Sequence, residues 1–165
     1  RKLTSIGTTP VEKSEVNMSE LLKEVVGALR EQPDFANRRL NLVLPEAPWP
    51  LPSVAGDPDL LLLAIHNLVD NAVKFTTSTD TIEVRAFEDG RDVAIEVADT
   101  GPGIPEHEID HVWEELYRGE GARAVPGSGL GLPLVQAIIE QHGGSVGLRS
   151  RPEQGTVFSV RLPTK

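Results

Sequence analysis

The sequence predicts an α/β fold, a two-layer sandwich in which about five strands form a mixed, mostly antiparallel sheet and three helices pack on it. Three segments carry apolar residues at helical spacing, and most segments with strand patterning come in neighbouring pairs that can form hairpins. Single strands do not alternate regularly with helices, which argues against a doubly wound parallel sheet.

Three long helices are expected. The first begins near Ser19, a suitable N-cap, and runs into the low thirties with leucine and valine at helical spacing. The second covers residues 57–75 and opens with an Asp-Pro pair, in which the aspartate caps the helix and the proline takes the first helical position. The third covers residues 129–142 and ends at two glycines, and a short helix is expected within residues 106–117.

Strands are expected where apolar and polar residues alternate between turn-forming residues. The clearest signal is a hairpin, because residues 88–91, which contain Asp-Gly, separate two such runs. A proline-rich connector at residues 45–52 excludes a helix there and disfavours a central strand. The expected strands are residues 40–44, 81–87, 92–99, 145–150 and 156–162.

The length and composition fit one globular domain, because 39% of the 165 residues are hydrophobic and 25% are charged. Residues 1–13 are polar and predict a linker, so the domain is expected at residues 14–165. The longest apolar run, residues 60–65, is far shorter than the roughly 20 residues that a membrane span needs. Cysteine is absent, which excludes disulfides and thiolate metal sites.

The net charge of −9, from 16 basic and 25 acidic residues, disfavours binding to nucleic acid or to an anionic membrane. The same negative charge disfavours the binding of any polyanion, including a nucleotide phosphate chain. Any phosphate ligand must therefore be held by local donors and a metal ion.

One helix carries a polar edge that could hold such a ligand. At about 100° per residue, Asn67, Asn71 and Lys74 lie within roughly 60° of one another, opposite the apolar residues of the same helix. Carboxamide oxygens suit Mg²⁺, and an ammonium suits phosphate. A solvated polar face is the alternative interpretation of this segment alone.

Two glycine-containing segments could approach a ligand closely. Asp99-Thr-Gly-Pro-Gly103 places a carboxylate at the end of a strand, where it can accept a hydrogen bond from an exocyclic amine, although a simple capped turn would have the same residues. Residues 127–132, Gly-Ser-Gly-Leu-Gly-Leu, precede a helix whose first N–H groups can bind phosphate. They match neither the dinucleotide fingerprint nor the Walker loop.

The three segments together resemble the ATPase domain shared by histidine kinases, DNA gyrase, Hsp90 and MutL, and are most similar to the histidine kinases. The helix segment at residues 67–76 resembles their N box, and the two glycine segments resemble their glycine boxes. His-Gly-Gly at 142–144 and Gly-Thr-Val-Phe at 155–158 resemble the closing pattern. The resemblance covers residues 16–163 and implies a Bergerat-type ATP-binding fold.

The resemblance implies a role for each matching residue on the phosphate side. Asn71 would hold Mg²⁺, Asn67 would support the phosphates or the water shell of the metal, and Lys74 would contact phosphate. Arg118 matches an arginine that can reach the γ-phosphate, so Asn71, Lys74 and Arg118 form the implied catalytic set. The implied phosphate loop consists of Gly127, Ser128, Gly129, Leu130, Gly131 and Leu132.

On the base side, the resemblance implies that Asp99 accepts from the 6-amino group of adenine. Phe75 would pack near the adenine, and Gly101, Gly103 and Ile104 would shape its pocket.

Residues 119–128 would form a lid over ATP. The chain departs from the family pattern near it, with Leu116 where a phenylalanine is usual and Trp113 where one is frequent. Anchoring of the lid and the role of Arg118 depend on this stretch.

Asn67 favours a kinase over an ATPase, because the hydrolases of this superfamily carry glutamate at the matching position as the base that activates water. The γ-phosphoryl group would then go to a histidine of a separate dimerisation and phosphoacceptor segment, from which residues 1–13 would be the linker. None of His66, His107, His111 and His142 lies in the expected acceptor setting. We expect a structural role for His66 and a favourable positive charge on His142 at the end of its helix.

The family implies further partners and a setting: a downstream response regulator, a cytoplasmic location as part of a bacterial sensor, and a monomeric isolated domain. Two other functions stay open. The domain could bind ATP as a regulatory module without transfer. Alternatively, His107-Glu108-x-x-His111 could bind zinc as a hydrolase does, with two histidines at i and i+4 of a helix.

Overall fold

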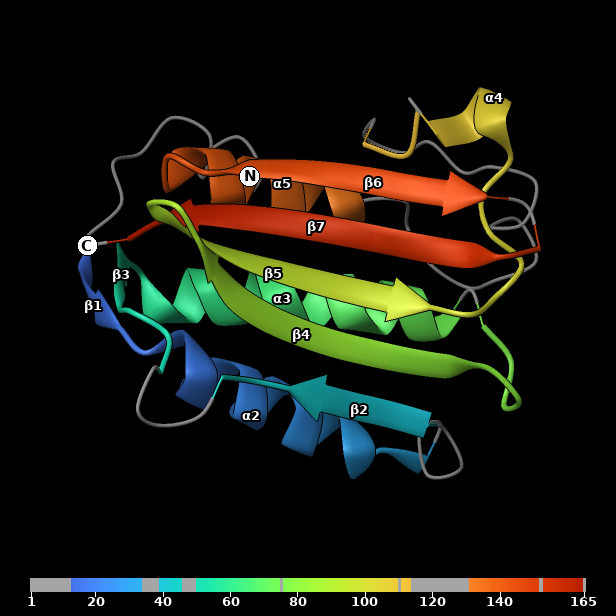
Figure 1. The fold of residues 1–165 in the computed structure, drawn as a ribbon, viewed down its shortest axis with the longest axis horizontal. Helices are drawn as coiled ribbons and strands as arrows, with labels where there is room; N and C mark the ends of the chain where they lie inside the picture. The colour runs from blue at the N-terminus through green and yellow to red at the C-terminus, as the bar shows by residue number, and fades with distance from the viewer. Residues whose placement is uncertain are drawn as a thin grey trace.

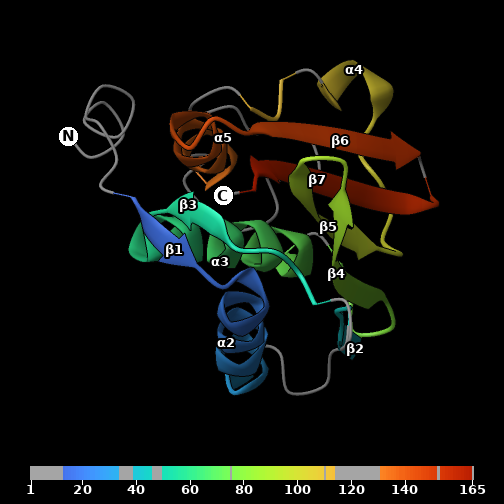
Figure 2. The ribbon, with the colours of Figure 1, turned by 60° about the vertical axis from the view of Figure 1, so that its left-hand side comes forward.

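The computed structural model describes residues 13–33, 39–45, 50–74, 76–109, 111–113, 131–151 and 153–164. The expected two-layer sandwich is confirmed: the main sheet lies in front of the long helices in Figure 1, and Figure 2 shows the helices on one side of it. No helix in these ranges is long and apolar enough to cross a membrane.

The main sheet contains β2 (Arg39–Val43), β4 (Thr81–Asp89), β5 (Asp92–Asp99), β6 (Ser145–Arg151) and β7 (Gly155–Pro163). Their order is β2-β4-β5-β7-β6. β2 pairs with β4 in parallel and the other neighbours are antiparallel, so the sheet is mixed and mostly antiparallel, as expected. The register places Asp99 of β5 opposite Thr156 of β7.

The hairpin between β4 and β5 is tighter than its sequence suggested. Asp89 pairs with Asp92, so the loop consists of Gly90 and Arg91 alone. Gly90 has a φ of +63°, which glycine adopts without the penalty that a Cβ atom imposes.

Four helices are described: α2 (Met18–Arg30), α3 (Pro58–Lys74), the short α4 (Glu106–Ile109) and α5 (Gly131–Gln141). The predicted cap of α3 is confirmed, because Asp57 Oδ1 accepts from the backbone N–H groups of the second and third helical residues at 2.9 and 3.2 Å. The predicted cap of α2 is wrong. Asn17, and not Ser19, is the N-cap, and its Oδ1 accepts from Glu20 N–H at 3.1 Å.

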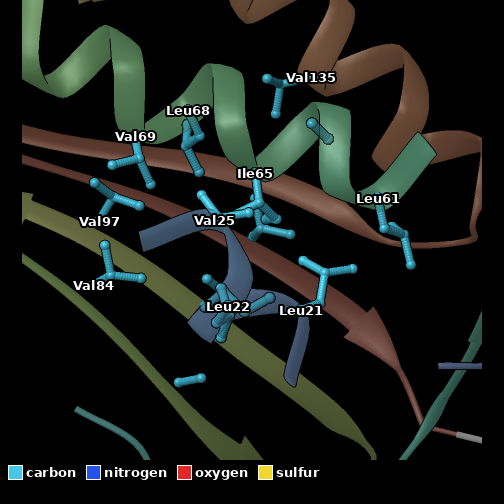
Figure 3. Close-up of a cluster of buried hydrophobic side chains, with 14 of the residues drawn as sticks. Leu21, Leu22, Val25, Leu61, Ile65, Leu68, Val69, Val84, Val97 and Val135 are labelled. Carbon is cyan, nitrogen blue, oxygen red and sulfur yellow. The ribbon is translucent and has the colours of Figure 1, made fainter. Parts of the chain in front are cut away.

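The core lies between the helices and the sheet, with α3 at its centre. Seven residues of α3 are buried. In Figure 3 the apolar side chains of α3 meet those of α2, α5 and the sheet, and the labelled residues are Leu21, Leu22, Val25, Leu61, Ile65, Leu68, Val69, Val84, Val97 and Val135. Burial of this face leaves the opposite, polar edge of α3 available for a ligand.

Two short strands were not predicted. β1 (Ser14–Val16) pairs antiparallel with β3 (Val54–Gly56), which directly precedes α3. Three residues are too few to show a periodic pattern, and the pairing joins segments 40 residues apart, so local sequence carries little signal for it. The β1–β3 pair ties the start of the domain to the start of α3.

The face of the sheet that points away from the helices carries paired charges. Arg85 lies 2.9 Å from Glu83 and 2.7 Å from Glu96, and Arg149 of β6 lies 3.8 Å from Glu96. These side chains alternate along their strands with buried residues of the helix side. This face is therefore crossed by a line of ion pairs from β4 to β6.

Candidate functional site

The polar edge of α3 faces the start of α5. Asn67 Nδ2 donates to the Leu63 carbonyl one turn earlier, at 2.8 Å. This bond leaves Asn67 Oδ1 beside Gly131, where a Cβ atom would lie 3.8 Å from that oxygen. Asn71 lies one turn further along α3 and is partly buried. The carboxamide of Asn67 therefore lies next to the first residue of a helix whose N–H groups suit anions.

Lys74 ends α3 and pairs with Asp70, with Nζ 3.1 Å from Oδ2. Both side chains are partly exposed, at 43% and 27%. Exposed pairs of this kind contribute about 0–1 kcal/mol, so the ammonium can leave Asp70 for a phosphate at little cost.

A cavity of about 240 Å³ opens where the end of α3 meets the end of β5. This is smaller than the roughly 300–1,000 Å³ typical of sites for drug-sized ligands, so it can enclose a planar base while the rest of a nucleotide stays outside. Its walls are mostly apolar, with one partly buried carboxylate. The lining residues are Ala72, Lys74, Thr76, Thr77, Asp99, Pro102, Gly103, Ile104, Thr156 and Phe158.

Asp99 is held at the base of this cavity. Its Oδ1 accepts from Gly101 N–H at 2.9 Å. Burial raises the pKa of Asp99, and the nearby charge of Asp80 raises it further, while hydrogen bonds from the backbone of Gly101 and Thr156 oppose the increase. A partly buried acceptor at the end of a strand, facing a mostly apolar space, is suited to an amino group on a planar ring.

The start of the loop after Asp99 is fixed to β4 by two hydrogen bonds between Thr100 and Thr81. Thr100 N–H donates to the Thr81 carbonyl at 3.1 Å, and Thr100 Oγ1 accepts from Thr81 N–H at 2.9 Å. Gly103 has a φ of +80°, which explains why glycine suits the bend that leads into the cavity wall.

Residues 56–165 match the family model described as "Histidine kinase-, DNA gyrase B-, and HSP90-like ATPase". The chain belongs to this family. Within the family, its relatives and structural neighbours include sensor histidine kinases and their catalytic domains.

A curated relative, the sensor protein KdpD of Escherichia coli (strain K12), is 38% identical over 143 residues, which is 86% of this chain and 16% of KdpD. The mycobacterial sensor histidine kinase MprB has a TM-score of 0.79 at 27% identity, with 93% of this chain and 99% of that chain covered. Full-length ShkA, solved in complex with AMPPNP, has a TM-score of 0.81 at 27% identity and covers 98% of this chain and 34% of its own. The chain thus spans a small part of the curated relatives, 16% of KdpD and 33% of the kinase BaeS of E. coli.

In this ATPase-family domain, the structure brings Lys74, Asp99, Gly103 and Ile104 together around one cavity. Asn67 and Asn71 lie on the preceding turns of α3 and do not line it. Gly131 begins α5 beside Asn67, and the remaining expected residues divide into two groups. Gly101 and Leu132 are buried, Leu132 with its side chain in the core. Phe75, Arg118, Gly127, Ser128, Gly129 and Leu130, together with the whole of the expected lid, lie outside the described residues.

Several residues of the cavity were missed at the sequence level. Thr156 and Phe158 point inward from β7, and Phe158 packs edge-on against Trp113 with 5.9 Å between ring centroids. Both lie in the Gly-Thr-Val-Phe segment, which was noted only as part of a pattern. Thr76 ends the expected N box and Thr77 follows it, so that motif was the available signal for both.

The prediction of a positive charge on His142 is wrong. The ring is 1% exposed, and Nε2 accepts from Asp57 N–H at 3.0 Å. Nδ1 lies 2.7 Å from the Ile138 carbonyl and must carry the ring proton. Because an imidazolium would donate from both nitrogens, His142 is neutral and joins the end of α5 to the start of α3.

The zinc alternative loses its geometric basis. α4 ends at Ile109, so His107 and His111 do not share a described helix, and His111 lies in an exposed turn. Among the described residues, no group of three His, Asp or Glu side chains is placed to hold a metal ion.

Proposed function

We propose that the domain binds Mg-ATP with the adenine in the cavity at Asp99, and transfers the γ-phosphoryl group to a histidine of a separate phosphoacceptor domain. One observation carries the proposal: the partly buried Asp99 carboxylate faces a mostly apolar cavity that lies between the end of α3 and the glycine-rich loop after β5.

The base side favours adenine over guanine. A carboxylate accepts hydrogen bonds, so it pairs with the 6-amino group of adenine and repels the 6-oxo group of guanine. Ile104 and Phe158 supply apolar walls for the planar ring. The AMPPNP bound to ShkA supports an adenine nucleotide as the ligand of this fold.

The phosphate side lies along α3 and at the start of α5. Lys74 supplies a mobile positive charge, and Gly131 begins a helix whose N–H groups favour anions. The donor set fits Mg²⁺, because Asn71 and Asn67 present neutral carboxamide oxygens on one edge. Asn71 would hold the ion, which would neutralise phosphate charge when bound.

Asn67 supports transfer over hydrolysis. Its amide nitrogen donates to the Leu63 carbonyl, and a carboxamide cannot take a proton from water at neutral pH. The better nucleophile is an imidazole nitrogen of another domain. It attacks the γ-phosphorus as the bond to the β-phosphate oxygen breaks, and ADP leaves. The domain contributes positioning and charge neutralisation by Lys74 and, as the family pattern implies, Arg118.

Calorimetric titration with a nonhydrolysable ATP analogue, with and without Mg²⁺, tests the site. We expect saturable binding that Mg²⁺ strengthens, and weaker binding of the matching GTP analogue. Zinc is titrated separately. If the chain binds no nucleotide and binds zinc tightly instead, the proposal is wrong, and zinc binding by His107 and His111 becomes the favoured function.

The substitution Asn71→Ala is expected to remove the strengthening of binding by Mg²⁺, because it deletes the proposed ligand oxygen. The measurement is the ratio of ATP-analogue Kd values without and with Mg²⁺. Asn41→Ala, the same change at an exposed position of edge strand β2, is the matched control and should leave the ratio unchanged. An undiminished Mg²⁺ effect in Asn71→Ala would show that Asn71 is not the ligand.

The isolated chain incubated with γ-labelled ATP is expected to remain unlabelled, because its four histidines lack the acceptor setting. Label should appear on an added phosphoacceptor domain from a sensor kinase. Transfer to that domain distinguishes a kinase from a regulatory ATP-binding module. Acid-labile, base-stable label on the isolated chain would mean that the acceptor lies within it.

A further inference from the structure

Ser150 lies near the end of β6 and joins three segments through one hydroxyl group. Its Oγ accepts from Ile104 N–H at 2.6 Å. The same oxygen lies 3.2 Å from the Gly155 carbonyl, to which it can donate, and 3.0 Å from Thr156 Oγ1. One hydroxyl has one proton and two lone pairs, so these three contacts use its full hydrogen-bonding capacity.

The partners of Ser150 belong to the cavity, although Ser150 does not line it. Ile104 and Thr156 are both lining residues. Thr156 also gives a backbone hydrogen bond to Asp99, the proposed acceptor of the adenine amine. Ser150 therefore lies behind the cavity wall. There it connects the loop at residues 100–104, called the glycine loop below, with β7.

The two halves of the glycine loop are held by different strands. The first half is bonded to β4 through Thr100 and Thr81. The second half depends on the β6–β7 hairpin, through Ser150 at Ile104 and through Glu153 N–H, which donates to the Pro102 carbonyl at 2.6 Å. Removing the Ser150 hydroxyl would release the wall at Ile104 while the contacts of Thr100 stay in place.

We propose that Ser150 is a positioning residue that sets the adenine selectivity of the cavity by fixing the wall at Ile104 against Thr156. The inference rests on the proposed binding of adenine. A fixed wall holds the base in the plane in which Asp99 meets the amino group of adenine, and prevents guanine from tilting away from the repulsive carboxylate.

The experiment compares Ser150→Ala, Ser150→Cys and Ser150→Thr with the wild-type chain by calorimetry, using nonhydrolysable ATP and GTP analogues. Cysteine keeps the size of the side chain with a weak hydrogen bond, and threonine keeps the hydroxyl. Ser145→Ala, the same change at the exposed start of β6, is the matched control. Thermal melts establish that each variant is folded at the titration temperature.

We expect Ser150→Ala and Ser150→Cys to raise the Kd for the ATP analogue about 3- to 10-fold, the size of one or two lost hydrogen bonds, and to narrow the gap between the GTP and ATP values. Ser150→Thr should keep the wild-type Kd for the ATP analogue and the wild-type preference for ATP over GTP, and Ser145→Ala should match the wild type.

If the wild type binds ATP selectively and Ser150→Ala keeps the same affinity and selectivity, the inference is wrong and the proposed function stands. Equal weakening for both nucleotides would reduce Ser150 to a structural residue. If the wild type binds neither nucleotide, both proposals fail.

Discussion

The substitution Gly155→Ala is expected to lower the free energy of unfolding by about 2–5 kcal/mol, through overpacking together with backbone strain. Gly155 has a φ of +107°, which side chains rarely tolerate. A Cβ atom there would collide with the carbonyl oxygen of Asp99 and lie 3.2 Å from Thr100 Cα. These neighbours are backbone atoms at the end of β5 and the start of the following loop, and they cannot rotate away as a side chain can. Urea denaturation followed by circular dichroism measures the loss.

Gly27→Ala is the control for this substitution. Gly27 lies within α2, and a Cβ atom there would meet nothing within 4 Å. Alanine is the better helix former, so this variant should gain roughly 0.5–1 kcal/mol. Opposite signs for the same chemical change would establish that the clash at Asp99, and not glycine replacement in general, is responsible. A Gly155→Ala protein as stable as the wild type would refute the close approach of β7 to the glycine loop.

The substitution Asp99→Asn is expected to weaken binding of the ATP analogue by about 1–3 kcal/mol, or roughly 5- to 150-fold. Asp99 already accepts from Gly101 and Thr156 and is proposed to accept from the adenine amine as well. An asparagine has one acceptor oxygen, so its NH₂ group must face at least one of these donors. The loss should be smaller for the GTP analogue, because the amide can donate to the 6-oxo group of guanine.

Stability separates this binding effect from damage to the fold. Because burial raises the pKa of Asp99 in the folded protein, its ionised form reduces stability above that pKa, and the reduction disappears below the unfolded pKa. At neutral pH the neutral asparagine removes this penalty, so Asp99→Asn should not unfold the protein. Asp92→Asn, the same change at the other end of β5, should bind ATP as the wild type does. Unchanged affinity in Asp99→Asn would exclude the proposed adenine contact.

Local sequence signals were sufficient where a residue acts on its own neighbours. Asp57 and Pro58 predicted the start of α3 because capping depends on the next three residues. At α2 the prediction chose Ser19 and was wrong, although Glu20 follows Asn17 by three residues, a spacing that favours Asn17 as the cap. The long strands were predicted because each alternates over several residues.

Sequence was insufficient where distant segments meet. β1 and β3 form only because residues 14–16 and 54–56 pair across α2 and β2. The charge state of His142 followed from Asp57 N–H, 85 residues away, which a helix-end argument does not include. Thr156 and Phe158 reach the cavity because the register of β7 on β5 places Thr156 beside Asp99. Such contacts depend on tertiary closure and have no local pattern.

The line of ion pairs on the sheet face that points away from the helices is expected to oppose aggregation through that face. Stacking a second sheet there would require dehydration of Arg85, Glu96 and Arg149, at a penalty of several kcal/mol for each fully buried ion. Phe87 is partly exposed on β4, and edge strand β2 exposes Val43, which on a neutral sheet would favour sheet-to-sheet association. The charged line favours a hydrated face and therefore disfavours self-association through it.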